Sequence, residues 1–189
     1  LWGYINESGQ PIIPFEYENL ADFKEGASAA QKNGKWGFID KKGNTIIPFL
    51  FDSHGFFEHG VCIISRNGKY GVITRQNQIL FPFQYDKIYD FINGAAIAEI
   101  NSQEELLSID GHIIIPAQLD YTYIGNFYDD LILVLKNLKF GYLNRQGQIA
   151  IPFKYDQAMS FKNGIAKVEV NSKSLCINTH GETVTCPPN

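Results

Sequence analysis

The stretch Gly34–Phe49, GKWGFIDKKGNTIIPF, decides the fold because related versions of it recur along the whole chain. The proline near its end recurs at residues 14, 48, 82, 116 and 152, with spacings of 34, 34, 34 and 36 residues. Twelve residues before these prolines lie Trp2, Trp36, Tyr70, Glu104 and Phe140. A second motif, F-x-x-G, follows the prolines, with Phe23, Phe57, Phe91 and Phe161 as its phenylalanines. Motifs at a fixed period and in a fixed order indicate an array of equivalent structural units.

The repeat divides residues 1–189, taken as a single array, into five full units and one partial unit. Their ranges are 1–35, 36–69, 70–103, 104–139, 140–173 and 174–189. The fourth unit departs most, because Glu104 and Glu105 replace the aromatic-glycine pair and Asp130 replaces the later glycine. A two-residue insertion delays its phenylalanine to Phe127. The sequence opens directly on Trp2 and stops within a unit, which suggests a segment of a longer array or a ring closed by its ends.

The composition indicates a folded chain and argues against two classes of partner. Hydrophobic residues make up 44% and aromatic residues 14%, enough for a sizeable core. The formal net charge is -4 and basic residues form no patch, so we expect no nucleic-acid binding. No run of about 18 apolar residues occurs, so we expect no membrane insertion. No signal-peptide pattern is present, and cytoplasm, cell envelope and secretion all stay open.

Three cysteines are too few, and odd in number, for a disulfide framework. Cys176 and Cys186 fall on the two arms of one expected hairpin, but in unequal positions, so they are not expected to face each other. We therefore expect Cys62, Cys176 and Cys186 to be free thiols with structural roles.

Each unit is interpreted as three short strands. The first spans residues 36–40 in the second unit and ends in a turn in which Gly43 takes a positive φ. The second strand, residues 45–47, is expected to end at Pro48, because proline donates no hydrogen bond to a sheet. The third strand, such as residues 95–100, connects to the following unit, and Asn-Gly pairs favour a tight hairpin at that connection. The fold class is therefore all-β.

Stacking of the units is expected to form the core, because one unit cannot bury its own apolar face. The third strands direct small or aliphatic residues inward: Ala30, Ile64, Ala98, Val134 and Val168. The aromatic series Trp2, Trp36, Tyr70 and Phe140 is also expected to be buried. Three strands in 34 residues favour an elongated, β-solenoid-like array. A closed, propeller-like ring is the alternative, although propeller blades have four strands and about 40 residues.

The phrase GKWGFIDKKGNTIIPF, followed by an F-x-x-G segment, resembles the bacterial WG repeat proteins, also called KWG repeat proteins. The resemblance covers essentially the whole chain and is weakest in the fourth unit. It implies a β-rich repeat and, usually, a role in interactions. It supplies no catalytic residues that could be transferred to this chain.

A search for catalytic and metal sites yields structural interpretations. His54 and His59 lie near Asp52 and Glu58, but no other unit has a histidine there, so we interpret them as solvated loop residues. One acidic residue per unit follows an aromatic position: Glu18, Asp52, Asp86, Asp120 and Asp156. Calcium sites gather several oxygens within a few residues, so these carboxylates are expected to accept backbone N–H groups in turns instead. We expect no metal, no cofactor and no enzymatic activity.

The function predicted from these observations is that of a non-enzymatic scaffold that binds another protein. The fourth unit is the expected contact region, because it breaks the repeat and its insertion adds aromatic residues. The residues concerned are Glu104, Glu105, Tyr121, Tyr123, Phe127, Asp129 and Asp130. The alternative is a carbohydrate or cell-wall binding module that uses surface aromatics, which requires exposed rings at Tyr17, Tyr85 and Tyr155. A third possibility is an accessory segment of an enzyme whose catalytic domain lies elsewhere.

Overall fold

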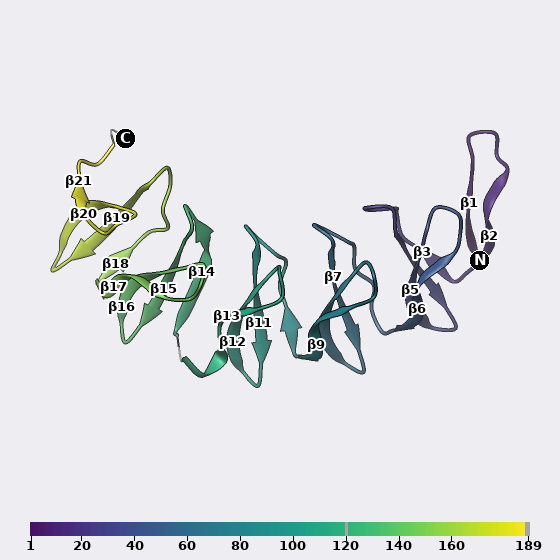
Figure 1. The fold of residues 1–189 in the computed structure, drawn as a ribbon, viewed down its shortest axis with the longest axis horizontal. Coiled ribbons are helices and arrows are strands. Elements are labelled where there is room, and N and C mark those ends of the chain that lie inside the picture. Colours follow the sequence, from purple (N-terminus) through teal and green to yellow (C-terminus); the bar gives the residue numbers. More distant parts are fainter. Residues whose placement is uncertain (120, 188–189) are drawn as a thin grey trace. The chain divides into compact units, whose positions relative to one another are not determined.

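The structure, a computed structural model, describes residues 1–119 and 121–187, so the expected role of Asp120 lies outside the described residues. The described chain is all-β, as predicted: antiparallel strands are joined by tight turns, and the remaining element is a short 3-10 turn. The chain divides into two compact units, Leu1–Ile88 and the part from Tyr89 onward, which we describe separately (Figure 1). Whether residues 1–189 act as a single array stays a prediction.

The first compact unit contains ten strands. They are β1 (Trp2–Ile5), β2 (Pro11–Tyr17), β3 (Asn19–Leu20), β4 (Ser28–Lys32), β5 (Lys35–Ile39), β6 (Thr45–Phe51), β7 (Val61–Arg66), β8 (Lys69–Thr74), β9 (Ile79–Tyr85) and β10 (Lys87–Ile88). Strands β1 and β2 form a hairpin, β3 to β6 form a four-stranded sheet in sequence order, and β7 to β9 form a three-stranded sheet.

The second compact unit repeats this arrangement. Its elements are β11 (Ala95–Ile100), β12 (Gln103–Ser108), β13 (Ile113–Ile115), η1 (Ala117–Leu119), β14 (Tyr123–Tyr128), β15 (Leu131–Lys136), β16 (Lys139–Asn144), β17 (Ile149–Tyr155), β18 (Gln157–Ala158), β19 (Ile165–Val170), β20 (Lys173–Asn178) and β21 (Thr183–Val184). Strands β14 to β17 and β18 to β21 form four-stranded sheets, each in sequence order.

Apart from the β1–β2 hairpin, the sheets combine the end of one sequence unit with the start of the next. Strand β4 is the last strand of unit 1–35, and it pairs along its whole length with β5, the first strand of unit 36–69. The short strands β3 and β18 add a fourth member to their sheets, which the three-strand interpretation did not include. The sheets are therefore offset by about half a repeat from the sequence units.

The predicted turn chemistry is confirmed. Gly43 has φ of +83°, and Asn77, which replaces this glycine in the third unit, has φ of +60°. The Asn33-Gly34 pair between β4 and β5 has φ of +54° and +73°, as a type I′ hairpin turn requires. These turns fix the pairing register of the strands that they join.

The prediction that Pro48 ends the second strand is wrong. Strand β6 runs from Thr45 to Phe51 and passes through the proline, and β2, β9 and β17 do the same at their own prolines. The reason is that β6 is the outer strand of its sheet, where a missing N–H leaves no ladder bond unmade. Proline at an outer strand also opposes pairing with further chains. Strand β13 alone among these equivalents ends at Ile115, before η1 begins.

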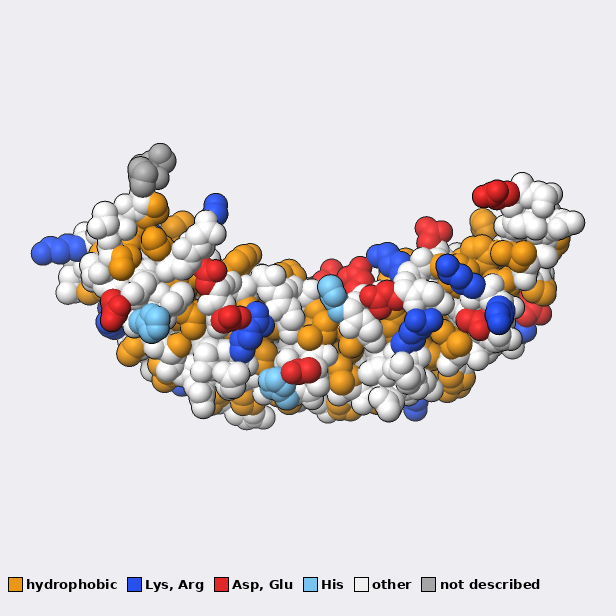
Figure 2. All heavy atoms as spheres, turned by 45° about the horizontal axis from the view of Figure 1, so that its top comes forward, with side chains coloured by type: hydrophobic (Ala, Val, Ile, Leu, Met, Phe, Trp, Pro, Cys, Tyr) orange, Lys and Arg blue, Asp and Glu red, His pale blue; other side chains and the backbone are white. Residues whose placement is uncertain are grey.

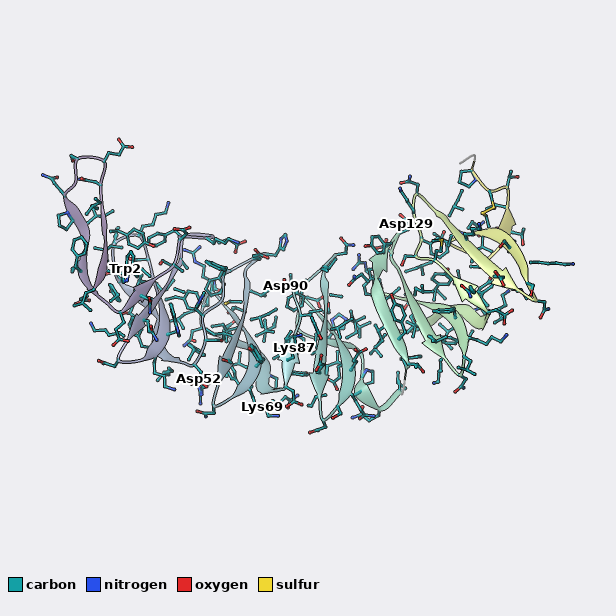
Figure 3. All side chains as sticks on the ribbon, turned by 180° about the vertical axis from the view of Figure 1, so that it is seen from behind. Trp2, Asp52, Lys69, Lys87, Asp90 and Asp129 are labelled. Atoms are coloured by element: carbon teal, nitrogen blue, oxygen red, sulfur yellow. A yellow bond between two sulfur atoms is a disulfide. The ribbon has the colours of Figure 1, made fainter. Side chains whose placement is uncertain are left out.

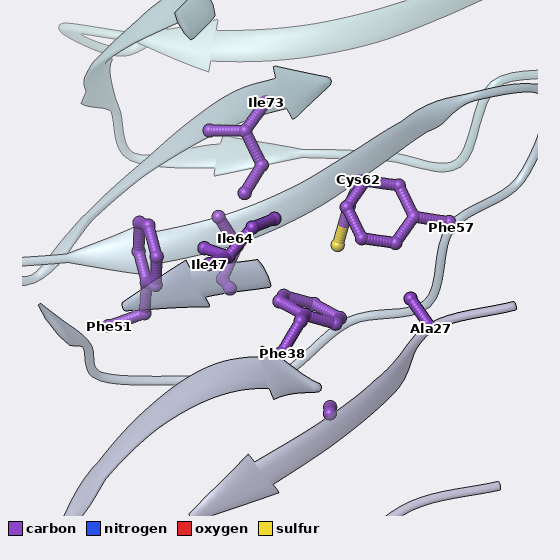
Figure 4. Packing of buried hydrophobic residues seen from close by; sticks show 9 residues of the cluster. Ala27, Phe38, Ile47, Phe51, Phe57, Cys62, Ile64 and Ile73 are labelled. Carbon is purple, nitrogen blue, oxygen red and sulfur yellow. The ribbon is translucent and has the colours of Figure 1, made fainter. Parts of the chain in front are cut away.

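The core lies between consecutive sheets. The inward third-strand residues are confirmed as buried, with exposures of 0% for Ala30, Ile64, Ala98 and Val134 and 2% for Val168. In the first compact unit, Phe57 packs against Phe38 with ring centroids 4.9 Å apart, beside Ala27 and Ile47 (Figure 4). The F-x-x-G phenylalanine thus fills the space above the sheet that precedes it.

The prediction of burial for the Trp2 series is wrong. Trp2 is 60% exposed, and Trp36, Tyr70 and Phe140 are half-buried. The fully buried rings lie two residues later, at Phe38 and at Tyr142. Trp36 lies beside the Asn33-Gly34 turn, at the end of its sheet, whereas Phe38 lies in the middle of the strand. Position along the strand, more than residue type, decides which ring is covered.

The expectation for the cysteines is confirmed for Cys62 and wrong for the other two. Cys62 is a buried free thiol whose pKa is raised to about 12 by burial, so it stays neutral. Cys176 and Cys186 form a disulfide, with Cα atoms 5.3 Å apart. Strand β20 pairs Cys176 with Val184, and the chain just beyond β21 brings Cys186 back within bonding range. None of the described helices is long and apolar enough to cross a membrane.

Candidate functional site

The recurring carboxylates are used inside the repeat turns, as predicted. The Gly68 N–H donates to Asp52 Oδ2 with an N–O distance of 3.0 Å, and Lys35 Nζ lies 2.6 Å from Asp52 Oδ1. Lys69, the residue equivalent to Lys35, pairs with Asp86. Figure 3 labels Asp52 and Lys69 in the first compact unit. The hydrogen bond from Lys35 is the main cause that lowers the pKa of the Asp52 carboxyl group, followed by the bond from Gly68. These oxygens therefore serve the hairpin turns.

Tyr17, Tyr85 and Tyr155 are buried, with exposures of 3%, 0% and 2%. Their rings pack between sheets and offer no face on which a sugar could stack. The burial removes the rings on which the carbohydrate alternative depended.

Glu105 has a structural explanation in the fourth unit. In the second unit the equivalent residue is Gly37, and a Cβ there would lie 2.7 Å from the Ile47 carbonyl oxygen and 3.0 Å from the Phe49 ring. In the fourth unit Ala117 takes the place of Phe49, and Glu105 is only 6% exposed. The Ala117 N–H donates to Glu105 Oε1 at 3.4 Å. A glutamate thus lies beside the position that the phenylalanine ring takes in other units.

The insertion near residue 121 adds less surface aromatic area than predicted. It forms β14, a six-residue strand that pairs with β15 and directs Phe127 into the core at 1% exposure. Tyr121 is half-buried, and its ring stacks on Phe153 with centroids 5.9 Å apart. Tyr123 is 46% exposed. Glu105 and Phe127 are therefore corrected from contact residues to core residues.

Three acidic residues of the fourth unit, Glu104, Asp129 and Asp130, lie on the surface, and two of them hold neighbouring turns. Asp130 Oδ1 lies 2.6 Å from Arg145 Nε, and Asp129 Oδ2 accepts the Gly164 N–H at 2.7 Å. Asp129 thereby reaches the equivalent turn of the next repeat, as Glu25 does with Gly60 in the first compact unit. Glu104 is exposed on β12. The site residues are thus not brought together into one cluster.

The F-x-x-G turns present a surface that the sequence reasoning missed. We define the turn row as the residues that directly follow the motif phenylalanines: Lys24, Glu58, Ile92, Tyr128 and Lys162. In the first compact unit, Lys24 and Glu58 form an ion pair with an N–O distance of 3.0 Å. In the second, Ile92 and Tyr128 are each 45% exposed. Comparison of equivalent positions across the repeats would have revealed this change from charged to apolar.

A hollow of about 840 Å³ lies beside Tyr128 in the second compact unit. Its residues are mostly apolar, with two lysines among them: Tyr128, Met159, Ser160, Phe161, Lys162, Asn163, Ile165, Lys167, Cys176, Cys186 and Pro187. Hydrophobic side chains gather at the surface near this C-terminal end of the chain (Figure 2). Met159 is 63% exposed.

Of the histidines considered as metal ligands, His54 contacts a ring of its own unit and His59 contacts the preceding unit. The His54 ring packs on Trp36 with centroids 4.4 Å apart, and the His59 N–H donates to Glu25 Oε1 at 2.8 Å. Within residues 1–119 and 121–187, no group of three or more His, Cys, Asp and Glu side chains is arranged to hold a metal ion.

The chain is a tandem β-repeat protein. Its sheets recur, carboxylates accept N–H groups in its turns, and the F-x-x-G phenylalanines pack on the preceding sheets. A family model described as the WG containing repeat matches residues 2–36, 36–70, 70–103, 108–139 and 140–173. The chain therefore belongs to the WG repeat family, as the sequence motif indicated.

Comparison with other known proteins adds no function. A search of curated proteins gave no match. Among solved structures, the chain is similar to Hsv2 from Kluyveromyces lactis (6% identity, TM-score 0.41, covering 90% of this chain and 63% of that chain). It is similar to a eukaryotic initiation factor (12% identity, TM-score 0.43, covering 96% of this chain and 59% of that chain). It is also similar to the secretion-system component PorZ of Porphyromonas gingivalis (7% identity, TM-score 0.35, covering 97% of this chain and 29% of that chain). The chain spans less than two thirds of each of these proteins.

Proposed function

We propose that this protein is a non-enzymatic scaffold that binds another protein through the second compact unit. The observation that supports this is the change in the turn row, from an ion pair at Lys24 and Glu58 to exposed apolar side chains at Ile92 and Tyr128. Recurring side chains are used in packing and in turns, which leaves the exposed positions free to suit a partner. Contiguous exposed apolar residues are typical of interaction sites.

The proposed contact region keeps the exposed part of the fourth unit. Glu104, Tyr123, Asp129 and Asp130 lie on the surface, and Tyr121 is half-buried. Tyr128, at the end of β14, joins this region to the turn row. Aromatic residues with a polar end are favoured at protein interfaces, because they offer both apolar area and a hydrogen bond.

The test is capture of partners from cells of the source organism with immobilised protein. We compare the wild type with an Ile92→Ser, Tyr128→Ser variant, and use a Lys24→Ser, Glu58→Ser variant as the matched control at equivalent positions. We expect a partner that the first variant loses and the control retains. Equal recovery of every protein with all three baits would refute this surface.

We also propose that the repeats form an open array rather than a closed ring. The contacts between turns link adjacent repeats, as in Lys24 with Glu58 and Asp129 with Gly164. Nearest-neighbour contacts of this kind are sufficient to build a solenoid. Small-angle X-ray scattering distinguishes an extended particle from a compact ring.

A further inference from the structure

We propose that the exposed pair Ile92 and Tyr128 docks a basic segment of a partner protein, in which lysine or arginine side chains flank apolar side chains. This inference rests on the proposed function and names the chemistry of the partner. Two observations support it. The two apolar turns lie side by side, and the charges around them are acidic, apart from one arginine that is already paired.

A hydrogen bond holds the turns of Ile92 and Tyr128 together in the second compact unit. The side-chain amide of Asn93 donates to the Phe127 carbonyl oxygen, with an N–O distance of 2.7 Å. Asn93 directly follows Ile92, and Phe127 directly precedes Tyr128. The two apolar side chains, each 45% exposed, therefore belong to one surface that spans neighbouring turns.

Arg145 fixes this pair of turns and uses its charge in doing so. Its guanidinium group donates to the Asn93 carbonyl oxygen at 3.0 Å, and its Nε lies 2.6 Å from Asp130 Oδ1. The same group lies 4.7 Å from the centroid of the Phe127 ring. The positive charge of this arginine is therefore already balanced within the protein.

The sequence that carries these turns is acidic throughout. Residues 89–135 contain eight acidic residues and neither lysine nor arginine, which gives a formal charge of -8. The stretch 21–67 of the first compact unit has the same length and contains five acidic and six basic residues, which gives +1. The part of the chain that exposes Ile92 and Tyr128 thus lacks the basic side chains that balance the acidic ones elsewhere.

Three of these carboxylates are close in sequence to the exposed pair. Asp90 is exposed two residues before Ile92, and Asp129 and Asp130 are exposed directly after Tyr128. Asp130 has φ of +62° at a position where the other four F-x-x-G turns have glycine. Because this conformation favours glycine, the acidic charge is kept there at a conformational cost.

The partner chemistry follows from this combination of apolar and acidic side chains. Apolar side chains of a partner segment can cover Ile92 and the Tyr128 ring, while its ammonium or guanidinium groups lie against the carboxylates. A cation can also bind over the face of the Tyr128 ring. An acidic segment would instead meet charges of its own sign, which disfavours it.

The probe is a fluorescein-labelled peptide, GKKLFKKG, and fluorescence anisotropy measures its binding to the full chain. Two altered peptides separate the contributions: GKKSSKKG keeps only the charges, and GEELFEEG keeps only the apolar residues. We expect GKKLFKKG to bind, with an affinity that falls as salt is added. Both altered peptides should bind at least about fivefold more weakly.

A first double variant removes acidic charge with residues taken from equivalent repeat positions. Asp90→Ser introduces the residue found at position 160, and Asp130→Gly introduces the glycine of the other turns. This variant should weaken binding of GKKLFKKG at least about fivefold. The charge-matched control, Glu7→Ser with Asp22→Ser at exposed positions of the first compact unit, should bind like the wild type. Circular dichroism checks the fold of both.

A second double variant removes the apolar surface without changing the net charge. Ile92→Lys with Tyr128→Glu installs the pair that Lys24 and Glu58 form at the equivalent positions of the first compact unit. It should also weaken binding of GKKLFKKG at least about fivefold.

Three results would overturn the inference. These are absence of GKKLFKKG binding, equal affinity of this peptide for the wild type and for either double variant, and binding of GKKSSKKG as tight as that of GKKLFKKG. The last result would mean that charge alone explains the contact.

Partner capture separates this inference from the proposed function. A partner that the Ile92→Ser, Tyr128→Ser variant loses, but that Asp90→Ser with Asp130→Gly retains, overturns the inference and leaves the function standing. A partner lost with both variants supports both. If no captured protein depends on the turn row, the proposed function itself fails.

Discussion

At the scale of the residue, the glycine of the WG motif is explained by close approach. A Cβ at Gly37 would lie 2.7 Å from the Ile47 carbonyl oxygen, so a larger residue requires a change in the facing strand. The fourth unit shows that change, with Glu105 in place of the glycine and Ala117 in place of the phenylalanine. The two substitutions compensate each other in space. Sequence reasoning identified the departure but assigned it to binding, because it compared one position at a time.

Compensation predicts a coupled response to mutation. Glu105→Gly should leave a void beside Ala117, and Ala117→Phe should clash with Glu105, so each is expected to destabilise the chain by about 1 to 3 kcal/mol. The double variant restores the pair found in the other units and should recover at least about 1 kcal/mol of that loss. Urea unfolding of the four proteins measures the coupling. Additive effects would contradict the compensation.

Leu138 is a second residue at odds with its position. It has φ of +61° and is 84% exposed, in the turn where two other repeats have glycine. The left-handed conformation is unfavourable for leucine, and no packing offsets it. Leu138→Gly should therefore raise the free energy of unfolding by about 1 kcal/mol. Gly68→Leu, the reverse change at the equivalent turn, should lower the free energy of unfolding. Thermal melts of the two variants and the wild type measure both effects.

At the scale of the element, turns were predictable, whereas burial was predicted correctly only for the small and aliphatic residues of the third strands. Asn-Gly pairs and turn glycines are read directly from sequence, because few other residues adopt positive φ. The exposure of Trp2, the burial of Phe127 and the course of β6 through Pro48 all depend on where a residue lies in its sheet. The Cys176–Cys186 disulfide was missed for the same reason, since strand register brings its partners together. Local chemistry fixes turns, whereas register decides which side chains meet.

The carboxylates that serve the turns predict a dependence of stability on pH. Lys139 donates to Asp156 and is the main cause of its lowered pKa, as Lys35 is for Asp52. Because the folded-state pKa is depressed, the stabilisation is complete above the unfolded value of about 3.9 and is lost as pH falls through the folded value. The melting temperature should therefore drop below about pH 4. The variant with Asp52→Asn and Asp156→Asn should be less stable than the wild type at pH 7. Its melting temperature should fall less than that of the wild type when the pH is lowered.

The disulfide predicts a local effect. It closes a loop across β20 and β21 with a sequence separation of 10 residues. Cys186→Ser should destabilise this sheet by about 2 to 3 kcal/mol, because the open chain has more freedom when unfolded. Hydrogen exchange should accelerate at Ile177, in β20, and should be unchanged at Phe38, in β5. Uniform acceleration in both strands would show that the bond stabilises more than its own sheet.

At the scale of the whole molecule, the offset between sequence unit and sheet ties the repeats together. A sheet such as β3–β6 takes β4 from one unit and β5 from the next, so no sequence unit contains a complete three- or four-stranded sheet of the described chain. The phenylalanine of the later unit then covers this sheet, as Phe57 covers Phe38. Each unit therefore depends on its neighbours both for strand pairing and for burial. The sequence revealed the period of the repeat, but strand pairing sets where one structural layer ends.

This offset predicts that the place of a cut matters more than fragment length. Residues 19–86 contain the sheets β3–β6 and β7–β9 and the full cluster around Phe38 and Phe57. Residues 36–103, a fragment of equal length that follows the sequence units, separate β4 from β5 and remove Ala27 and Ala29 from that cluster. Fragment 19–86 should therefore melt cooperatively and at the higher temperature, whereas unit 36–69 alone should show no cooperative melt, because it cannot bury its apolar face. Circular dichroism melts decide between the alternatives: a more stable 36–103 would make the sequence unit, rather than the sheet, the layer that folds.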